Sequence, residues 1–341
     1  MSEPAEKRFL VPHGPGGNSD RQESFSVIVA AFQSAHVIGH AIESLLAQTL
    51  APLEIVVCDD GSTDDLDAAL GQYRERIVLI RQENGGEAAA KNAAAGAASG
   101  DFLAILDADD AYLPGRLEAL AALARARPDL DILTSDAFLE VNGERVRRCY
   151  SEGWTFEVDD QRMGILERNF IFGHVAVRRE RFLATGGFDE TIRWTTDWDL
   201  WIRMILDGAR VGCVAEPLAI YRVHEGSLSA HRPQLVAGRV QTLEKTAARH
   251  DLLPAERAIV QHSLSHHRHE LALLELRAAL REDQRDARAR AIAVARDRRF
   301  PYRVRVNAAA AALLPTVAGR RERRRDAQAW VGAGGTHVSR R

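Results

Sequence analysis

Three aspartates crowd together after an apolar segment of the chain and could hold a metal ion. Asp107, Asp109 and Asp110 directly follow Phe102–Leu106. Two carboxylates about 4 Å apart repel each other by roughly 4 kcal/mol at an effective dielectric of 20, so such crowding favours a bound cation. Oxygen ligands suit Mg²⁺ or Mn²⁺, either of which would bridge to substrate phosphates. The structural alternative is an acidic turn that caps the helix beginning near Pro114.

A second acidic pair follows another apolar segment. Asp59 and Asp60 come after Glu54–Cys58, and Gly61 permits a tight turn behind them. A carboxylate held at the end of a strand can accept hydrogen bonds from a base N–H group or from ribose hydroxyls. We therefore expect Asp59 and Asp60 to face a ligand, and residues 62–64 to cap the helix that follows.

A small-residue helix provides one candidate for phosphate or base recognition. Gly85 and Gly86 precede this segment, which carries Lys91 and Asn92. Small side chains allow a ligand to approach closely, and the lysine offers a positive charge to a phosphate or a donor to a base carbonyl. An alanine-rich helix without any ligand is the alternative.

A later amphipathic segment places a carboxylate at a helix start. Asp197 precedes Trp198 and Trp201, so it can either cap the helix or accept a proton from an acceptor hydroxyl in a partly dry cleft. We interpret Asp199 as mainly structural. His224 lies in a polar loop further on and is a candidate metal or diphosphate ligand.

Alternating strands and helices must position these residues. The predicted strands are Ser26–Ala31, Glu54–Cys58, Ile77–Ile80, Phe102–Leu106 and Asp131–Ser135. Apolar residues three and four apart predict one helix over residues 36–50 and another over residues 115–127. This order is typical of an α/β fold with a mostly parallel sheet flanked by helices, in which ligands bind beyond the carboxyl ends of the strands.

Composition sets the class of protein and its expected partners. A net charge of −3 and a pI near 6.5 give no general attraction to nucleic acid. The three cysteines are odd in number and far apart, which argues against a disulfide framework and fits a reducing cytoplasm. The first 24 residues lack the apolar core of a secretory signal, and no stretch approaches the roughly 20 apolar residues that span a bilayer.

The chain divides into three predicted regions. Residues 1–24 form a flexible tail, residues 25–230 a catalytic domain, and residues 231–341 a helical region rich in Arg and Ala. Within the last region, His262, His266 and His269 share one helical face, which we interpret as a polar face without zinc. The basic and apolar segment 296–325 could rest on an anionic membrane or on an acidic patch of a partner, and a solvated helix is an equal alternative.

Seven motifs in order give the chain a resemblance to a known family. They are SVIVAAFQ, QTLAPLEIVVCDDGSTD, NGGEAAAKN, FLAILDADD, GGFDE, TDWDLW and YRVHEGSLS, which lie between Ser26 and Ser229. In this order they resemble the inverting family 2 glycosyltransferases of the GT-A fold, and seven ordered motifs are far more specific than any single one. The resemblance implies a Rossmann-like α/β domain that uses a nucleotide-sugar donor.

The resemblance also implies roles for individual residues. It makes Asp197 the catalytic base, and Asp109 and His224 the ligands of Mn²⁺ or Mg²⁺. Asp107 and Asp109 form the D-x-D motif. The implied donor-binding residues are Ala30, Phe32, Asp59, Asp60, Asn84, Gly85, Lys91, Asp107 and Ala108.

Three positions depart from the family pattern. The first motif ends in AAFQ where Pro-Thr-Tyr-Asn is common, Lys91 stands where arginine is usual, and Thr196 replaces a glutamate. Because lysine lacks the bidentate geometry of arginine, nucleotide binding is better supported than uridine specificity. The change at Thr196 affects acceptor-side hydrogen bonding and leaves Asp197 in place.

The predicted function is metal-assisted transfer of a sugar. The expected donor is a UDP-sugar, and the expected acceptor is a hydroxyl group of a carbohydrate, lipid-linked or other molecule. The reaction would serve cell-surface polysaccharide, glycolipid or glycoconjugate synthesis, in the cytoplasm or at the inner face of the plasma membrane. Two alternatives stay open. A sugar nucleotidyltransferase would usually carry a Gly-rich basic loop after its first strand, where this chain has AAFQSAH. A non-catalytic nucleotide-sugar-binding subunit would not need the complete set of acidic residues.

Overall fold

The computed structural model describes residues 9–12, 22–141, 143–151, 155–171, 173–223 and 232–322. These residues fall into two compact units. The first contains residues 1–230 and 245–260, and the second contains residues 231–244 and 261–341. Each of the two long helices α8 (Arg232–Ala247) and α9 (Pro254–Arg281) contributes residues to both units.

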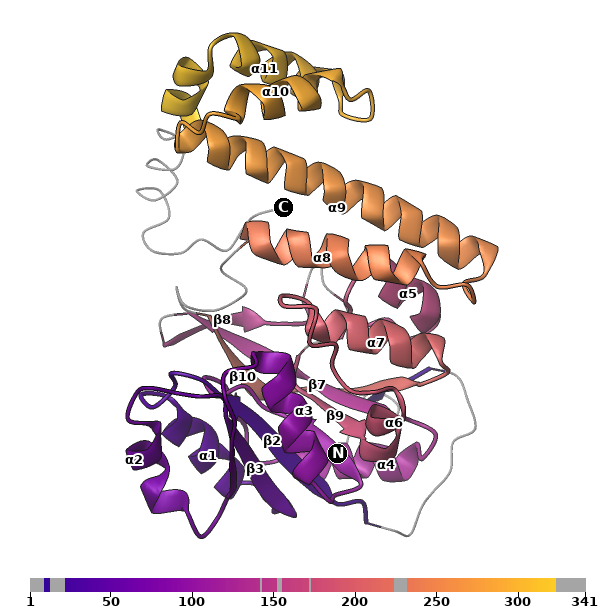
Figure 1. Cartoon of the computed structure of the whole chain (residues 1–341). Helices are drawn as coiled ribbons and strands as arrows, with labels where there is room; N and C mark the ends of the chain where they lie inside the picture. The colour runs from indigo at the N-terminus through magenta and orange to yellow at the C-terminus, as the bar shows by residue number, and fades with distance from the viewer. Residues whose placement is uncertain are drawn as a thin grey trace. The chain divides into compact units, whose positions relative to one another are not determined.

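The first unit is built on one large sheet (Figure 1). Among the described residues its strands are β1 (Phe9–Leu10), β2 (Phe25–Ala31), β3 (Glu54–Asp59), β4 (Val78–Arg81), β5 (Phe102–Ile105), β6 (Ala111–Tyr112), β7 (Ile132–Val141), β8 (Glu144–Arg148), β9 (Val175–Arg178) and β10 (Val211–Val223). The strand order is β1-β10-β7-β9-β5-β2-β3-β4, with β6 paired to β10 and β8 paired to β7.

The central part of the sheet is parallel. β5, β2, β3 and β4 are parallel neighbours, and β10 pairs with β7 in the same sense. β9 runs antiparallel to both β5 and β7 and so joins the two parallel parts. The mostly parallel sheet that the sequence predicts is confirmed, and the carboxyl ends of four neighbouring strands meet at one edge.

Helices flank this sheet. They are α1 (Ile38–Leu46), α2 (Leu66–Leu70), the short 3₁₀ helix η2 (Gly71–Tyr73), α3 (Glu87–Ala97), α4 (Arg116–Ala126), α5 (Gln161–Glu167), α6 (Arg179–Ala184) and α7 (Thr196–Leu206). The apolar face predicted for residues 36–50 is present in α1, where Ile38, Ala41, Ile42 and Leu45 are buried. Figure 1 shows α3 lying along β2 and β3, which brings its residues toward the strand ends.

Two predicted boundaries differ from the structure. Within the predicted N-terminal tail, Phe9 and Leu10 pair antiparallel with Val214 and Cys213, because β10 continues far enough to offer them an edge. The strand predicted over residues 131–135 continues to residue 141 as β7, where it pairs with β8 and β10.

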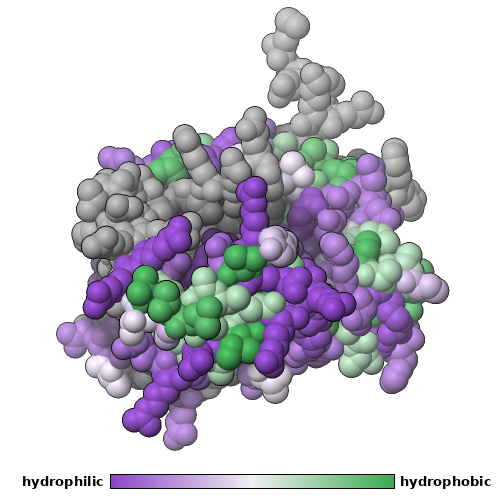
Figure 2. Space-filling model, turned by 90° about the horizontal axis from the view of Figure 1, so that it is seen from above, coloured by the Kyte–Doolittle hydropathy of each residue, from purple (hydrophilic) through white to green (hydrophobic). Residues whose placement is uncertain are grey.

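The second unit is helical. The later part of α9 packs with α10 (Ala287–Arg296) and α11 (Tyr302–Leu313) around buried Leu276, Leu280 and Phe300. Figure 2 looks onto the face that carries α10 and α11 and shows a group of apolar residues bordered by hydrophilic ones. Among the described helices, none combines the length and the hydropathy that crossing a bilayer requires.

Candidate active site

The ends of the parallel strands bring the predicted site residues together. Ala31 of β2 lies beside Asp59 of β3, which lies beside Arg81 of β4. β5 pairs with β2 on the other side and leads directly into Asp107. The loops after all four strands therefore begin at one edge of the sheet, as the general geometry of open α/β sheets requires.

Asp60 organises the loop before α3. Its Oδ1 accepts hydrogen bonds from Gln82 Nε2 and from the backbone N–H of Gly85, and its Oδ2 accepts one from the backbone N–H of Gly86, each at 2.8 Å. The side-chain amide of Asn84 donates to the carbonyl of Asp60. These bonds make Asp60 the residue that shapes the loop, and its predicted contact with a donor stays a prediction.

The turn after Asp60 requires glycine. Gly61 has a φ of +74°, and a Cβ atom there would lie 2.8 Å from the backbone nitrogen of Asn84. A side chain would therefore displace the loop that Asp60 holds. Asp59, by contrast, accepts a bond from the backbone N–H of Ser62 and has Arg81 at 3.8 Å from its Oδ2.

Residues 62–64 do not cap the helix that follows them, so this prediction was wrong. Ser62 Oγ accepts from the backbone N–H of Gln33, and Asp64 Oδ2 accepts from that of Ala35. The side chain of Gln33 in turn accepts from the N–H groups of Thr63 and Asp64. The polar side chains instead satisfy the backbone of the loop between β2 and α1, which lies beside them in space.

The buried Lys91 forms an ion pair with Asp107, the first aspartate of the D-x-D motif, whose side chain is 41% exposed. Its Nζ lies 2.7 Å from Asp107 Oδ1 and also contacts Glu87, one helical turn earlier. Burial lowers the pKa of Lys91, but the charges of Asp107 and Glu87 outweigh it, so the pKa is raised. Burial raises the pKa of Asp107, and Lys91 reverses this so that the pKa is lowered. Both groups are thus held in their charged forms.

The third aspartate of the cluster is a structural anchor. The buried Asp110 places Oδ2 2.7 Å from His174 Nε2, and its Oδ1 accepts from the backbone N–H of Arg222. The guanidinium of Arg222 donates to the carbonyl of Asp109. Burial raises the pKa of Asp110 to about 6, while His174 lowers it and the charges of Asp107 and Asp109 raise it. Asp110 therefore ties the acidic loop to the ends of β9 and β10.

Asp197 stands in the first turn of α7, where the charges of Lys91 and Asp107 act on it. The amide of Asn169 donates to its Oδ2 at 2.9 Å. Burial raises the pKa of Asp197, although the N–H of Trp198, the charge of Lys91 and the bond from Asn169 lower it. Asp107 raises it further. A carboxylate with a raised pKa is suited to accept a proton.

Other motif residues hold the site in shape. Asn92 exchanges hydrogen bonds with the backbone of Phe188, and Gly187 has a φ of +69° where a Cβ atom would lie 2.5 Å from the Asn92 side chain. This contact explains why the GGFDE motif lies beside α3. The structural role expected for Asp199 is confirmed, because its buried carboxylate binds both Arg203 and Lys245.

The remaining predicted residues lie at the same edge or outside the described chain. Ala30 is near the end of β2, the ring of Phe32 is exposed just beyond it, and Ala108 is buried between the aspartates. Asn84 and Gly85 are exposed next to Asp60. His224, predicted as a metal ligand, lies outside the described residues.

Three residues of this site carried no recognised signal in the sequence. Glu87 could have been found, because it stands four residues before Lys91 in a predicted helix, where opposite charges face each other. Asn169 and His174 could not have been found in this way. Asn169 is 28 residues from its partner Asp197 in the sequence, and His174 is 64 residues from its partner Asp110.

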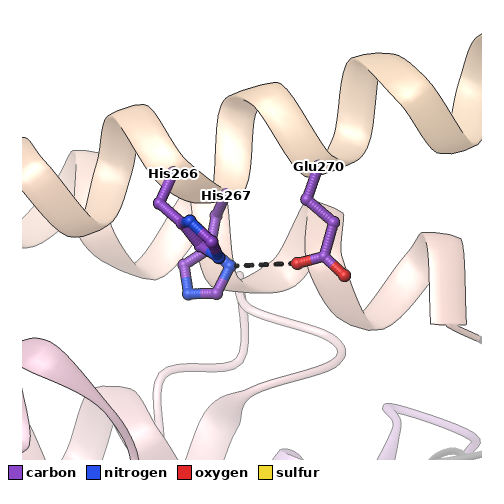
Figure 3. Close-up of side chains that lie close together, drawn as sticks. All are labelled: His266, His267 and Glu270. Atoms are coloured by element: carbon purple, nitrogen blue, oxygen red, sulfur yellow. Dashed lines mark ion pairs between the residues drawn. The ribbon is translucent and has the colours of Figure 1, made fainter. Parts of the chain in front are cut away.

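A histidine group lies elsewhere, in the second unit (Figure 3). Among the described residues, His266, His267 and Glu270 of α9 place ligand atoms within 4.8 Å of one another. Arg232 pairs with Glu270 at 2.8 Å, and the charge of Arg239 acts on His267. Because both neighbours are cationic, this group does not suit a metal ion. It also differs from the predicted face of His262, His266 and His269.

Comparisons with known sequences point to one family. The family model described as Glycosyl transferase family 2 matches residues 26–185. The succinoglycan biosynthesis protein ExoO of Rhizobium meliloti (strain 1021) is 33% identical over an alignment of 231 residues, and the match covers 62% of this chain and 64% of that protein. The chain spans less than two thirds of the length of the first curated relatives it matches.

Solved structures share the fold. S. aureus TarS residues 1–349 in complex with UDP-GlcNAc superpose with a TM-score of 0.62 at 20% identity, over 90% of this chain and 92% of that chain. The mannosyltransferase PcManGT of Pyrobaculum calidifontis, in complex with GDP-Man and Mn²⁺, gives 0.53 at 20% identity, over 89% and 85%. The predicted GT-A type of fold is confirmed by these likenesses.

Proposed function

We propose that the protein is an inverting glycosyltransferase of family 2, a proposal supported by the family model that matches residues 26–185. It moves a sugar from a nucleoside diphosphate to a hydroxyl group of an acceptor. The product has the opposite configuration at the anomeric carbon, because one displacement joins the acceptor to the sugar.

One observation carries the proposal. Lys91, Asp107 and Asp197 come from separate parts of the chain, yet the charges of Lys91 and Asp107 both act on the carboxylate of Asp197. A cationic group, the D-x-D motif and a carboxylate of raised pKa thus lie close enough for their charges to interact. This is the set of groups that sugar transfer from a diphosphate needs.

Asp197 acts as the general base. Asn169 holds the carboxylate through Oδ2, and burial favours its proton-bound form. It takes the proton from the acceptor hydroxyl while the oxygen of that hydroxyl bonds to the anomeric carbon, and the bond to the diphosphate breaks. Proton transfer by a positioned side chain contributes about 10²- to 10⁴-fold in rate.

The acidic loop fits a divalent cation, Mn²⁺ or Mg²⁺. Asp107 and Asp109 both raise the pKa of Asp110, so negative charge is concentrated in this loop. Carboxylate oxygens are the ligands that these cations prefer. Asp109 would hold the ion, with His224 as a second ligand. When bound, the cation supplies positive charge that stabilises the departing diphosphate.

The donor that we propose is a UDP-sugar. Its proposed binding residues stand at or just after the ends of β2, β3 and β5, in the loop before α3 and in α3 itself: Ala30, Phe32, Asp59, Asp60, Asn84, Gly85, Lys91, Asp107 and Ala108. TarS is in complex with UDP-GlcNAc and PcManGT with GDP-Man, so proteins of this fold take different bases. Lys91 in place of the usual arginine leaves base choice to the pocket as a whole.

The acceptor that we propose is a hydroxyl of a carbohydrate or lipid-linked molecule in cell-surface polysaccharide synthesis. The name of the relative ExoO assigns that protein to succinoglycan biosynthesis, which supports this class. We place the enzyme in the cytoplasm, in peripheral contact with the inner face of the plasma membrane through its basic C-terminal region.

A panel of nucleotide sugars tests the proposal. Thermal unfolding is followed with each compound, with and without Mn²⁺, and the stabilising compound is then assayed for release of its nucleoside diphosphate. A ligand at a hundred times its Kd adds about 2.7 kcal/mol to the free energy of unfolding. Asp109→Asn should remove the increment that Mn²⁺ gives, and the exposed Asp65→Asn should keep it.

Two results would contradict the proposal. Stabilisation by a nucleoside triphosphate and a sugar phosphate, and by no nucleotide sugar, would indicate a nucleotidyltransferase. Stabilisation by a nucleotide sugar without hydrolysis or transfer would indicate a binding subunit.

A further inference from the structure

An apolar stripe on α11 faces solvent. Tyr302, Val306 and Leu313 stand four and seven residues apart in α11, so they lie on one helical face, and Val317 adds an exposed apolar residue after the helix ends at Leu313. Their exposed fractions run from 46% to 76%, and Leu314 beside them is 60% exposed. Scattered exposed apolar residues are ordinary, but a contiguous group bordered by polar residues marks an interaction surface.

The surroundings of this stripe are strongly basic. Residues 296–322 contain seven arginines and two acidic residues, in a chain whose net charge is −3. Arg303, Arg320 and Arg321 are exposed next to the apolar residues. Of the two acidic residues, Asp297 is already paired with Arg299 at 2.9 Å. The surface therefore complements an anionic partner.

An apolar groove continues inward from the stripe. A cavity of about 310 Å³ lies between α9 and α11 of the second unit, with Leu276, Leu280 and Ala308 among its walls. Leu314 and Val317 belong both to this cavity and to the exposed stripe. Apolar groups of a partner that contact the stripe would therefore find a recess in which to pack.

We propose that the α11 face, defined as Tyr302, Val306 and Leu313 of α11 together with Leu314 and Val317 just after its end, docks on an anionic lipid bilayer. The apolar side chains enter the boundary between head groups and acyl chains, and the arginines contact the phosphates. An amphipathic helix with a basic border binds a membrane surface in this way, and each arginine near the surface strengthens binding about fivefold. The inference deepens the location proposed above and requires no transferase activity.

Co-sedimentation of the full-length chain with vesicles tests the proposal. One set of vesicles is pure phosphatidylcholine, and the other contains about one third phosphatidylglycerol. We expect the protein to sediment with the anionic vesicles, to remain in solution with the neutral ones, and to bind less as salt is raised.

Two variants locate the surface. Leu313→Glu with Leu314→Glu should weaken binding to anionic vesicles by about tenfold or more, since it removes two apolar side chains and adds negative charge. Its matched control is Leu53→Glu with Leu253→Glu, because these leucines of the first unit are 57% and 59% exposed. The control should bind as the unaltered chain does.

A second variant tests the charge without touching the apolar residues. Arg303→Gln with Arg320→Gln and Arg321→Gln should weaken binding about fivefold for each arginine. Its control is Arg76→Gln with Arg125→Gln, two exposed arginines of the first unit. Circular dichroism and thermal unfolding establish that each variant is folded.

Several outcomes overturn the proposal. They are sedimentation with neither vesicle, equal sedimentation with both, and unchanged binding by folded variants of the α11 face. If vesicles do not bind but sedimentation velocity shows a dimer that Leu313→Glu with Leu314→Glu abolishes, the face is a contact between two copies. Failure of nucleotide-sugar transfer alone leaves these readouts unaffected, so the two proposals fail separately.

Discussion

Replacing Asp197 with asparagine should remove the chemistry and keep the fold. The change preserves size, and the amide can still meet Asn169, which now donates to Asp197 Oδ2 at 2.9 Å. Loss of a general base costs about 10²- to 10⁴-fold in rate, which equals about 2.7 to 5.4 kcal/mol of barrier. Donor hydrolysis measures the rate, and thermal stabilisation by the same nucleotide sugar measures donor binding, which should persist.

Asp199→Asn is the matched control. Asp199 stands two residues later in α7, but its buried carboxylate binds Arg203 and Lys245, at 2.7 and 2.8 Å. Because Lys245 is partly exposed, losing these pairs should lower the free energy of unfolding by about 2–3 kcal/mol. Below its unfolding temperature this variant should keep its turnover. Near-normal hydrolysis by Asp197→Asn, or an equal loss of rate in both variants, would refute the assignment of the base.

Three further predictions concern the surroundings of the site. Asn169→Ala removes a bond that lowers the pKa of Asp197, so the acid limb of the pH–rate profile should move to higher pH, because the base must lose its proton to act; an unmoved limb contradicts the contact. Gly61→Ala should lower the free energy of unfolding by about 1–3 kcal/mol in urea titrations, since φ is +74° there; an unchanged midpoint would be inconsistent with this turn. Lys91→Met should destabilise the fold by about 1–2 kcal/mol, because it leaves Asp107 without its buried partner, and Lys91→Arg should recover part of the loss; equal stability of the two variants would argue against the ion pair.

The sequence predicted the edge of the sheet because strand ends follow from pattern. β2, β3 and β5 are apolar runs whose boundaries the structure moves by one residue at most at either end. Since parallel neighbours present the same ends at one edge, Asp59 and Asp107 had to approach each other once the strands were known. Local pattern and general topology were sufficient for this part.

Contacts between distant side chains could not be predicted in this way. His174 meets Asp110 only because β9 runs antiparallel between β5 and β7, and no local pattern specifies that insertion. The role expected for residues 62–64 failed for a similar reason. A capping side chain satisfies whichever backbone N–H groups are nearest in space, and the nearest ones belonged to the loop at Gln33 and Ala35.

Lys91 stands where arginine is usual, and this changes how the positive charge contacts the neighbouring carboxylates. Lys91 is enclosed between Glu87 and Asp107, and a compact ammonium with three donors can serve both carboxylates at once. In the proposed function, a diphosphate bound at this edge would compete with Asp107 for the same ammonium. Glu87 raises the pKa of Lys91 as well as Asp107 does, so the ammonium would keep one carboxylate partner during that exchange. We therefore propose that donor binding is linked to the release of Asp107, whose carboxylate would then be free to act with Asp109 on a cation.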